Sequence, residues 1–299
     1  MTQDALAAVR QAHPGLRPAE QRVADAVLAD PVAIVTMSVS DLAERCNTSV
    51  ATVVRFCQAA GFAGYGDLRL QLASSQGRQE VTLGRFGVSD AEIDPDDDAA
   101  DVLAKIAYHE ARAIEATAGS IDLDTLDAVA DAVIAADRVD IYGVASSSLA
   151  AIDLQHKLHR VGLVSFYYSD IHLALTSAAV LTDRSVSVGF SHSGRTVETV
   201  ESLTTAQQMG ATTVAVTNFP HSPVTDHADH VLLTSAAETR FRPGAMSSRI
   251  AQLAVVDFLF VRLVQRSQLH NLPSFRGTYD AVQQHRLPQR RTSQGRPRP

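Results

Sequence analysis

Three hydroxyl side chains within six residues form the stretch of this chain that is best suited to chemistry. They are Ser191, Ser193 and Thr196, and Gly194 lies between them. Hydroxyl groups donate hydrogen bonds to phosphate oxygens, and a glycine lets the backbone approach an anion closely, where a Cβ would obstruct it. The spacing therefore indicates a phosphate site. Ser193 or Thr196 alone would equally serve as an ordinary helix cap.

A strand must end and a helix must begin at this stretch. Valine and phenylalanine alternate with small residues over 185–190, which predicts a strand, and Val197, Val200 and Leu203 return on one face of a helix. The start of a helix leaves backbone N–H groups without partners and carries the positive end of the helix dipole. An anion bound by the hydroxyls would meet both.

Strand and helix patterns alternate through the second half of the chain. The predicted strands are 139–144, 163–167, 185–190, 213–217 and 231–233. The predicted helices between them are 148–161, 171–180, 196–209 and 223–227, and two amphipathic helices, 99–118 and 124–136, come before. This alternation predicts a parallel sheet with helices on both faces, in which ligands bind at the carboxyl ends of the strands.

The sequence of the first part of the chain predicts short helices. Ser40 is the expected N-cap of a helix over 41–46, and it is a plain cap because Ala43 stands where a capping box needs an acceptor. A tight turn leads into a second helix over 49–60, which Gly61 ends. Two short helices joined by a tight turn are typical of a helix-turn-helix, and also of an ordinary helical hairpin.

The second of these helices has two different faces. Val50, Val53, Val54 and Cys57 follow helical spacing and predict a buried stripe. The opposite face carries Ser49, Thr52, Arg55 and Gln58. Such hydroxyls bind phosphates or base edges, and an arginine binds guanine or a phosphate.

These stretches resemble a known family. Ser191-His-Ser193-Gly194-Arg195-Thr196 is similar to the Ser-x-Ser-Gly-x-Thr phosphate loop of sugar isomerase (SIS) domains, in the form found in RpiR/MurR-type regulators. The segments Asp41-Leu-Ala, Thr48-Ser-Val-Ala-Thr-Val-Val-Arg-Phe56 and Gly61-Phe-Ala-Gly-Tyr65 resemble the helix-turn-helix of those regulators. The resemblance implies DNA contacts by Thr48, Ser49, Thr52 and Arg55, and core positions for Phe56 and Phe62.

Two further motifs extend the resemblance over the second half of the chain. Gly143-Val-Ala-Ser-Ser-Ser148 is similar to the SIS motif Gly-x-Gly-x-Ser, with Ala145 at the second glycine. Met246-Ser-Ser-Arg-Ile-Ala-Gln252 is similar to the Ser-Ser-Arg segment at the start of the last SIS helix. The expected effector-binding residues are therefore Ser147, Ser148, Ser191, Ser193, Gly194, Thr196, Glu238, Ser248 and Arg249.

The resemblance implies a transcriptional regulator of sugar metabolism that binds operator DNA and a phosphosugar effector, and that is not an enzyme. The alternative is a phosphosugar isomerase with Glu238 as the base, because SIS isomerases carry a glutamate before the last helix. Moving a proton between neighbouring carbons needs such a base, but no partner base is evident in the sequence. A sugar-binding adaptor without DNA contact is a third alternative, which the helix-turn-helix pattern opposes.

Composition limits the class of protein. The chain has 299 residues, a formal net charge of −7 and two cysteines, and no run reaches the roughly 20 apolar residues of a membrane span. We expect a cytoplasmic protein without membrane contact, metal or cofactor. Seven basic and eight acidic residues balance one another up to Glu80, so DNA binding needs a homodimer or homotetramer.

The expected domains follow from these patterns. They are an all-α helix-turn-helix domain over 1–78, an acidic linker over 79–98, an SIS domain with a flavodoxin-like three-layer fold over 99–275, and a basic tail over 276–299. The tail has five arginines and no acid after Asp280, which indicates disorder. Such a tail is solvated or touches DNA phosphates.

Overall fold

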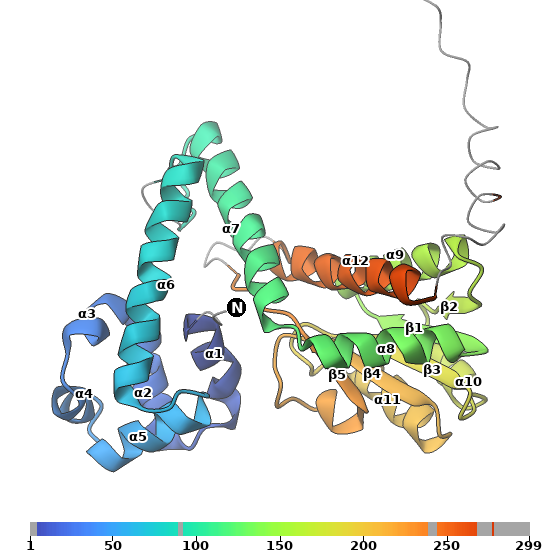
Figure 1. Ribbon diagram of the computed structural model, residues 1–299, viewed down its shortest axis with the longest axis horizontal. Coiled ribbons are helices and arrows are strands. Elements are labelled where there is room, and N and C mark those ends of the chain that lie inside the picture. The colour runs from blue at the N-terminus through green and yellow to red at the C-terminus, as the bar shows by residue number, and fades with distance from the viewer. Residues whose placement is uncertain (1–4, 89–91, 239–243, 268–276, 278–299) are drawn as a thin grey trace, which may run out of the picture.

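The computed structural model describes residues 5–88, 92–238, 244–267 and 277. A helical domain and an α/β domain lie side by side, and a hairpin of two long helices joins them (Figure 1). Most of the basic tail lies outside the described residues. The helical domain consists of α1 (Ala5–Ala12), the 3-10 helix η1 (His13–Gly15), α2 (Pro18–Ala29), α3 (Pro31–Thr36), α4 (Val39–Arg45), α5 (Val50–Ala59) and α6 (Tyr65–Phe86).

The start of α4 differs from the prediction. Its N-cap is Ser38, whose Oγ accepts the N–H of Asp41 at 3.2 Å, while the Asp41 carboxylate accepts the N–H of Ser38 at 3.3 Å. The expected plain cap at Ser40 is therefore wrong, because an acid three residues after Ser38 completes a capping box there. The helix therefore begins at Val39, two residues earlier than predicted.

The turn between α4 and α5 has the backbone that its residues favour. Asn47 adopts a left-handed φ of 46°, which asparagine tolerates better than most residues. Ser49 caps α5, and Gly61 follows the helix with a φ of 86°. Phe56 is fully buried in the helical core, as the family resemblance implied. Val50 is 41% exposed, so the buried stripe begins one turn later than predicted.

The hairpin is formed by α6 and α7 (Ala99–Ser120) (Figure 1). The first of these helices continues eight residues past position 78, into the segment that we expected to be linker. Asp98 caps α7, and the ammonium of Lys105 lies 2.7 Å from the carboxylate of Asp97. This hydrogen bond from Lys105 lowers the pKa of Asp97. The acidic residues thus order the start of α7.

The α/β domain contains a five-stranded parallel sheet. Its strands are β1 (Arg138–Gly143), β2 (Ser165–Tyr167), β3 (Ser185–Phe190), β4 (Thr212–Thr217) and β5 (His230–Leu233). Their order is β2-β1-β3-β4-β5, and every neighbouring pair is parallel. This is the flavodoxin-like order, whose ligand crevice lies between the ends of the first and third strands.

Helices cover both faces of the sheet, which confirms the three-layer prediction. The remaining helices are α8 (Leu123–Ala135), α9 (Ser147–Arg160), α10 (Ile171–Ala178), α11 (Val197–Gln208), the 3-10 helix η2 (Thr225–His227) and α12 (Ser247–Ser267). The main core joins α8, α9 and α12 to one face, and smaller apolar clusters join α10 and α11 to the other. Within the described residues, none of the helices combines the length and apolarity needed to span a membrane.

Candidate functional site

The loop between β3 and α11 brings two predicted hydroxyls together. Ser191 is 1% exposed, and its Oγ donates a hydrogen bond to Oγ1 of Thr196 at 3.0 Å. The first backbone bond of α11 runs from the N–H of Val200 to the carbonyl of Thr196 at 3.0 Å. The N–H groups of the preceding turn therefore lack a partner within the helix, as helix starts do. Both hydroxyls lie at the positive end of α11.

Gly194 is required by packing within this loop. It has a φ of +66°, and a Cβ there would lie 2.0 Å from Oγ of Ser222. Its N–H donates to the carbonyl of Ser191 at 3.0 Å. The sequence suggested that this glycine leaves room for an anion, whereas the structure shows close contact with Ser222. Ser193 is exposed, and its Oγ accepts the N–H of Arg195 at 3.2 Å.

The loop between β1 and α9 is equally tight. A Cβ on Gly143 would lie 2.8 Å from the carbonyl oxygen of Ser147, the first residue of α9. Ala145 has a φ of +52°, a conformation that costs an L-residue roughly 1–2 kcal/mol. Oγ of Ser148 donates to the carbonyl of Ala145 at 2.6 Å. This alanine stands where the SIS motif has a glycine, and its backbone adopts the left-handed conformation that a glycine favours.

Glu238 lies at the start of α12. Its carboxylate accepts the N–H of Ser248 at 2.9 Å and also the N–H of Met246 and the hydroxyl of Ser248. Ser248 is 2% exposed. The structure thus unites these two predicted residues, but it does so by using the glutamate to cap a helix.

Two side chains in the first turns of α12 carry polar atoms that the described residues leave without a hydrogen bond. They are Nε of Arg249 and Nε2 of Gln252, and both atoms are buried. Gln252 as a whole is 1% exposed. Buried donors of this kind call for an acceptor, such as water or a ligand. Arg249 was predicted as an effector residue, whereas Gln252 was only quoted as part of the motif.

Several buried polar residues at the carboxyl ends of β4 and β5 were not predicted from the sequence. Thr217 and Thr234 are fully buried, Asn218 is 5% exposed and Ser235 is 6% exposed. They lie at the same edge of the sheet as Ser191. Consecutive polar residues directly after an apolar strand are the signal that marks such an edge.

The outward face of α5 is smaller than predicted. Thr52 is only 5% exposed, so its placement on the outward face was wrong, and its contact with DNA stays a prediction. Its Oγ1 lies 3.0 Å from Oγ of Ser49 and accepts a hydrogen bond from Nη2 of Arg55 at 2.9 Å. The hydroxyl is occupied by these neighbours and orients them. Ser49 and Arg55 are exposed, and Thr48 is half-buried.

Arg22 fixes the turn of the helix-turn-helix from α2. Its Nε donates to the carbonyl of Cys46 at 3.0 Å, and its Nη2 donates to the carbonyl of Asn47 at 3.0 Å. These carbonyls end α4 and would otherwise lack partners. The contact joins residues 24 and 25 positions apart, so local sequence patterns do not reveal it.

The two cysteines behave as core residues. Both are free and buried, and burial raises the pKa of the Cys57 thiol to about 12. Burial also raises the pKa of Cys46. A thiol of this kind is a poor nucleophile at neutral pH. In the part of the chain that the structure describes, no group of three or more potential ligands is arranged for a metal ion.

Comparison with known proteins identifies both domains. The model of the helix-turn-helix domain of the rpiR family matches residues 3–79, and the SIS domain model matches residues 133–262. An uncharacterized HTH-type transcriptional regulator of Caldanaerobacter subterraneus subsp. tengcongensis is 38% identical over 263 residues, which are 88% of this chain and 91% of that protein. A similarly named regulator of Haemophilus influenzae is 34% identical over 84% of this chain and 86% of its own length.

A solved structure agrees with these matches. The Vibrio vulnificus NanR protein complexed with ManNAc-6P is 26% identical, with a TM-score of 0.59, and the match covers 93% of this chain and 98% of that one. The order of elements, the sheet topology and the matched relatives extend over both domains. The chain therefore belongs to the HTH-type transcriptional regulators that join an RpiR-family helix-turn-helix domain to an SIS domain.

Proposed function

We propose that the α/β domain binds a phosphosugar and that this binding changes the affinity of the helix-turn-helix domain for operator DNA. The observation that carries the proposal is the pairing of Ser191 with Thr196 at the positive end of α11. The phosphate would meet hydroxyls and backbone N–H groups together there. The Vibrio vulnificus NanR protein, whose match covers 93% of this chain, was solved in complex with ManNAc-6P.

The rest of the effector reaches from this loop along the carboxyl edge of the sheet. Ser147 and Ser148 begin α9 next to the crevice between β1 and β3. The start of α12 brings together Glu238, Ser248 and Arg249. The N–H of Arg249 Nε is buried there and has no hydrogen-bond acceptor among the described residues. We assign these residues to the sugar hydroxyls. We also assign to the sugar hydroxyls the side-chain amide of Gln252, whose Nε2 has no hydrogen-bond partner among the described residues.

We propose binding without turnover, and therefore no catalytic residue and no cofactor. An aldose–ketose isomerase needs a base free to take a proton from carbon. The carboxylate of Glu238 accepts hydrogen bonds from the start of α12 instead. The isomerase alternative predicts interconversion of aldose and ketose phosphates by the purified protein, which proton NMR detects directly.

We further propose a homodimer or homotetramer that acts on operator DNA in the cytoplasm. One helix-turn-helix reads one half-site, so a dimer doubles the contacts. An apolar surface hollow between α7, α8 and α12 offers a place for a second copy, since Leu123 and Val261 there are 71% and 56% exposed. Sedimentation at micromolar concentration tests this, and a monomer that still binds operator tightly would contradict it.

Calorimetry with a panel of phosphosugars, including N-acetylmannosamine 6-phosphate, tests the effector site. Ser193→Ala should weaken binding of a responding phosphosugar by about tenfold to a hundredfold, since one hydrogen bond to a charged group is lost. Ser267→Ala, at the far end of α12, is the matched control. The unphosphorylated sugar should bind poorly to every variant. Equal affinities of wild type and Ser193→Ala would show that the loop only caps α11.

A further inference from the structure

A buried side chain links the helical domain to the end of the sheet. Gln11 in α1 is 5% exposed, and its Nε2 donates to the carbonyl oxygen of Thr234 at 3.2 Å. Thr234 directly follows β5. In Figure 1, α1 is the part of the helical domain that faces the α/β domain. The side-chain amide of Gln11 therefore forms a direct hydrogen bond between the helical domain and the α/β domain. The α/β domain carries the loop of residues 191–196, which we call the phosphate loop.

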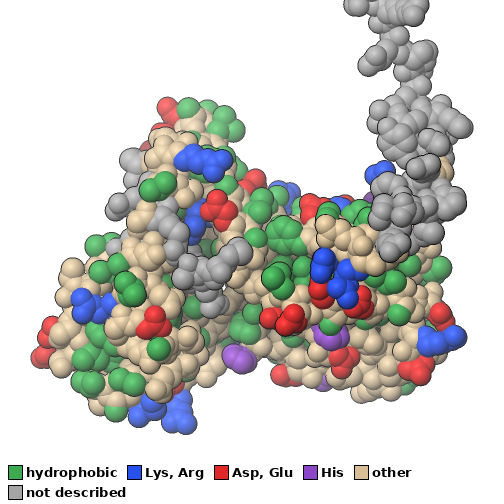
Figure 2. All heavy atoms as spheres, viewed as in Figure 1, with side chains coloured by type: hydrophobic (Ala, Val, Ile, Leu, Met, Phe, Trp, Pro, Cys, Tyr) green, Lys and Arg blue, Asp and Glu red, His purple; other side chains and the backbone are tan. Residues whose placement is uncertain are grey.

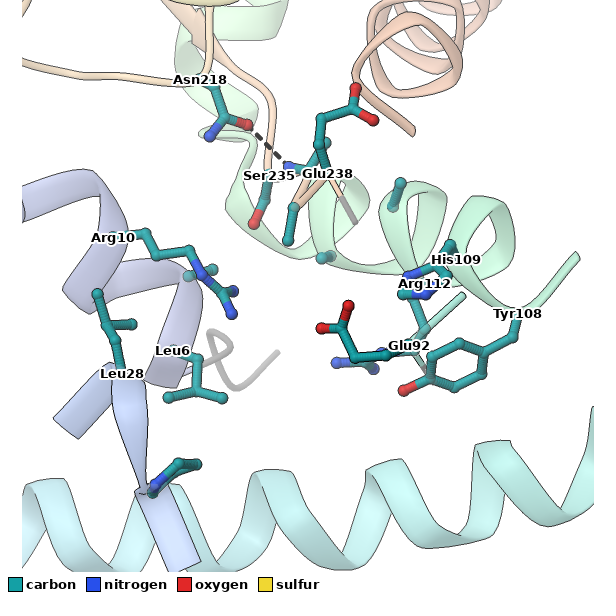
Figure 3. A pocket seen from close by; sticks show the side chains of 16 residues that line it. Leu6, Arg10, Leu28, Glu92, Tyr108, His109, Arg112, Asn218, Ser235 and Glu238 are labelled. Atoms are coloured by element: carbon teal, nitrogen blue, oxygen red, sulfur yellow. Dashed lines mark hydrogen bonds between the residues drawn. The ribbon is translucent and has the colours of Figure 1, made fainter. Parts of the chain in front are cut away.

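Thr234 belongs to a buried network. It is fully buried, and its hydroxyl donates to Oδ1 of Asn218 at 3.2 Å. The same oxygen accepts the N–H of Ala236 at 2.8 Å, the bond drawn as a dashed line in Figure 3. Asn218 follows β4, so its side chain ties the ends of β4 and β5 to each other.

Asn218 also holds the phosphate loop. Its N–H donates to the carbonyl oxygen of His192 at 3.1 Å, and the hydroxyl of Thr217 donates to the same oxygen at 3.2 Å. His192 lies between Ser191 and Ser193. A continuous set of short contacts therefore runs from the loop through Asn218 and Thr234 to Gln11.

This network passes beside a cavity. A pocket of about 310 Å³ lies at the junction, and α1, α7 and the residues after β4 and β5 line it. Figure 3 shows Leu6 and Arg10 on one side of the pocket and Asn218, Ser235 and Glu238 on the other. The two domains lie against each other in the space-filling view (Figure 2). The hydrogen bond from Gln11 lies at this junction, and the adjacent cavity leaves room for α1 to change position.

A movement of α1 would change the position of α5, the helix with the predicted DNA-contacting residues, because the helices of this domain pack against one another. The helical core joins Val9 of α1 to Val23 of α2 and Val53 of α5 in one buried cluster. Glu20 of α2 contacts Arg55 of α5 at 3.5 Å. Coupling between distant sites needs such a contiguous set of packed and hydrogen-bonded groups.

We infer that Gln11 couples the phosphate loop to the helical domain. When a ligand binds residues 191–196, the resulting shift is transmitted through Asn218 and Thr234 to α1. This inference rests on the proposed function of the loop. Hydrogen bonds in a low-dielectric interior depend strongly on distance and angle, so a small shift of the His192 carbonyl changes the restraint on α1. The class of ligand that operates the coupling is a phosphorylated small molecule.

Hydrogen–deuterium exchange of the full chain tests the coupling. The probes are inorganic phosphate and N-acetylmannosamine 6-phosphate. In wild type, a probe should change exchange in the loop and also in α1. In Gln11→Leu the loop should still respond, and the response of α1 should fall by about threefold to tenfold, the effect of one lost hydrogen bond. Gln11→Glu, which keeps the shape but replaces the donor, serves if the leucine variant does not fold.

A matched control comes from the same domain. The side-chain amide of Gln21 donates to the carbonyl of His13 at 3.3 Å, within the helical domain. Gln21→Leu should keep the full response of α1. A loop response with an unchanged α1 response in Gln11→Leu would overturn the coupling and leave the phosphate site standing. A loop that responds to neither probe in wild type would overturn both proposals.

Discussion

The Nε atom of Arg55 lies 3.5 Å from Oε1 of Glu20, across the boundary between α5 and α2. The side chain of the acid is 9% exposed, whereas that of the arginine is 53% exposed. One end of the guanidinium is thus held by a buried charge and by Thr52, and the other end is open to solvent. The orientation of the arginine is set before any DNA arrives.

Arg55→Ala should weaken operator binding by about 1–3 kcal/mol if the arginine contacts a base, with the fold intact. Fluorescence anisotropy against a labelled operator measures the loss. Arg184→Ala removes an equal charge from the α/β domain, where that side chain is 75% exposed, and should leave operator affinity unchanged. Equal affinities of Arg55→Ala and wild type would remove Arg55 from the DNA-contacting residues.

Glu20→Gln should lower specificity rather than abolish binding. The amide keeps an oxygen for the N–H of Arg17, which the carboxylate accepts at 3.1 Å, but it no longer neutralises Arg55. Affinity for random DNA should therefore rise, because one more positive charge faces the phosphates. The ratio of operator to random affinity should fall by about threefold to tenfold, the size of a weak charge contact. An unchanged ratio in competition titrations would limit Glu20 to a folding role.

Gly194→Ala should destabilise the α/β domain by two separable effects. The left-handed backbone alone costs roughly 1–2 kcal/mol for an L-residue, and the new Cβ would meet Ser222 at 2.0 Å. Gly210→Ala has a φ of +84° and nothing within 4 Å, so it should show the backbone cost alone. Adding Ser222→Gly to Gly194→Ala should recover the remainder. Urea unfolding of wild type and these three variants measures the losses in stability, and equal losses at both glycines would contradict close packing at Gly194.

Acid should weaken the contact between α8 and α12. A hydrogen bond from Arg266 lowers the pKa of Asp131, and one from Arg262 lowers the pKa of Asp127, both from an ordinary value of 3.8. A folded-state pKa below the unfolded value gives stability that is present above pH 3.8 and is lost as the pH falls through the folded pKa. The melting temperature of wild type should therefore drop more steeply below this pH than that of Arg266→Gln. Parallel curves of melting temperature against pH for the two proteins would show that the contacts of Arg266 do not contribute to stability.

Local periodicity predicted most of the fold. The strand 185–190 was predicted with the bounds that the structure gives, because valine and phenylalanine alternate there with small residues. The cap of α4 was misplaced by two residues because Ser38 and Ser40 are both good caps, and only Asp41 distinguishes them. Thr52 was placed on the outward face by helical phase alone. Phase does not show that the side chains of Ser49 and Arg55 bond to its hydroxyl.

Contacts between distant residues account for what sequence reasoning missed. The hydroxyls of Ser191 and Thr196 are five residues apart, and a motif captured them. The partners of Arg22 are backbone carbonyls, and two of the three links from His192 to Gln11 also end on backbone carbonyls, which every residue possesses. Residue identity therefore carries no signal for them. Only the tertiary arrangement shows which carbonyl a glutamine or an arginine will meet.

The 223 positions between Gln11 and Thr234 have a consequence for how the protein is made. The helical domain is fully synthesised long before Thr234 leaves the ribosome, and domains fold as units from the N-terminus. During that time the amide of Gln11 is hydrated and α1 has no partner beyond its own domain. The tie between the lobes forms only when β5 closes the edge of the sheet. A chain cut short before that strand would therefore release a helical domain that lacks its hydrogen bond to the end of the sheet.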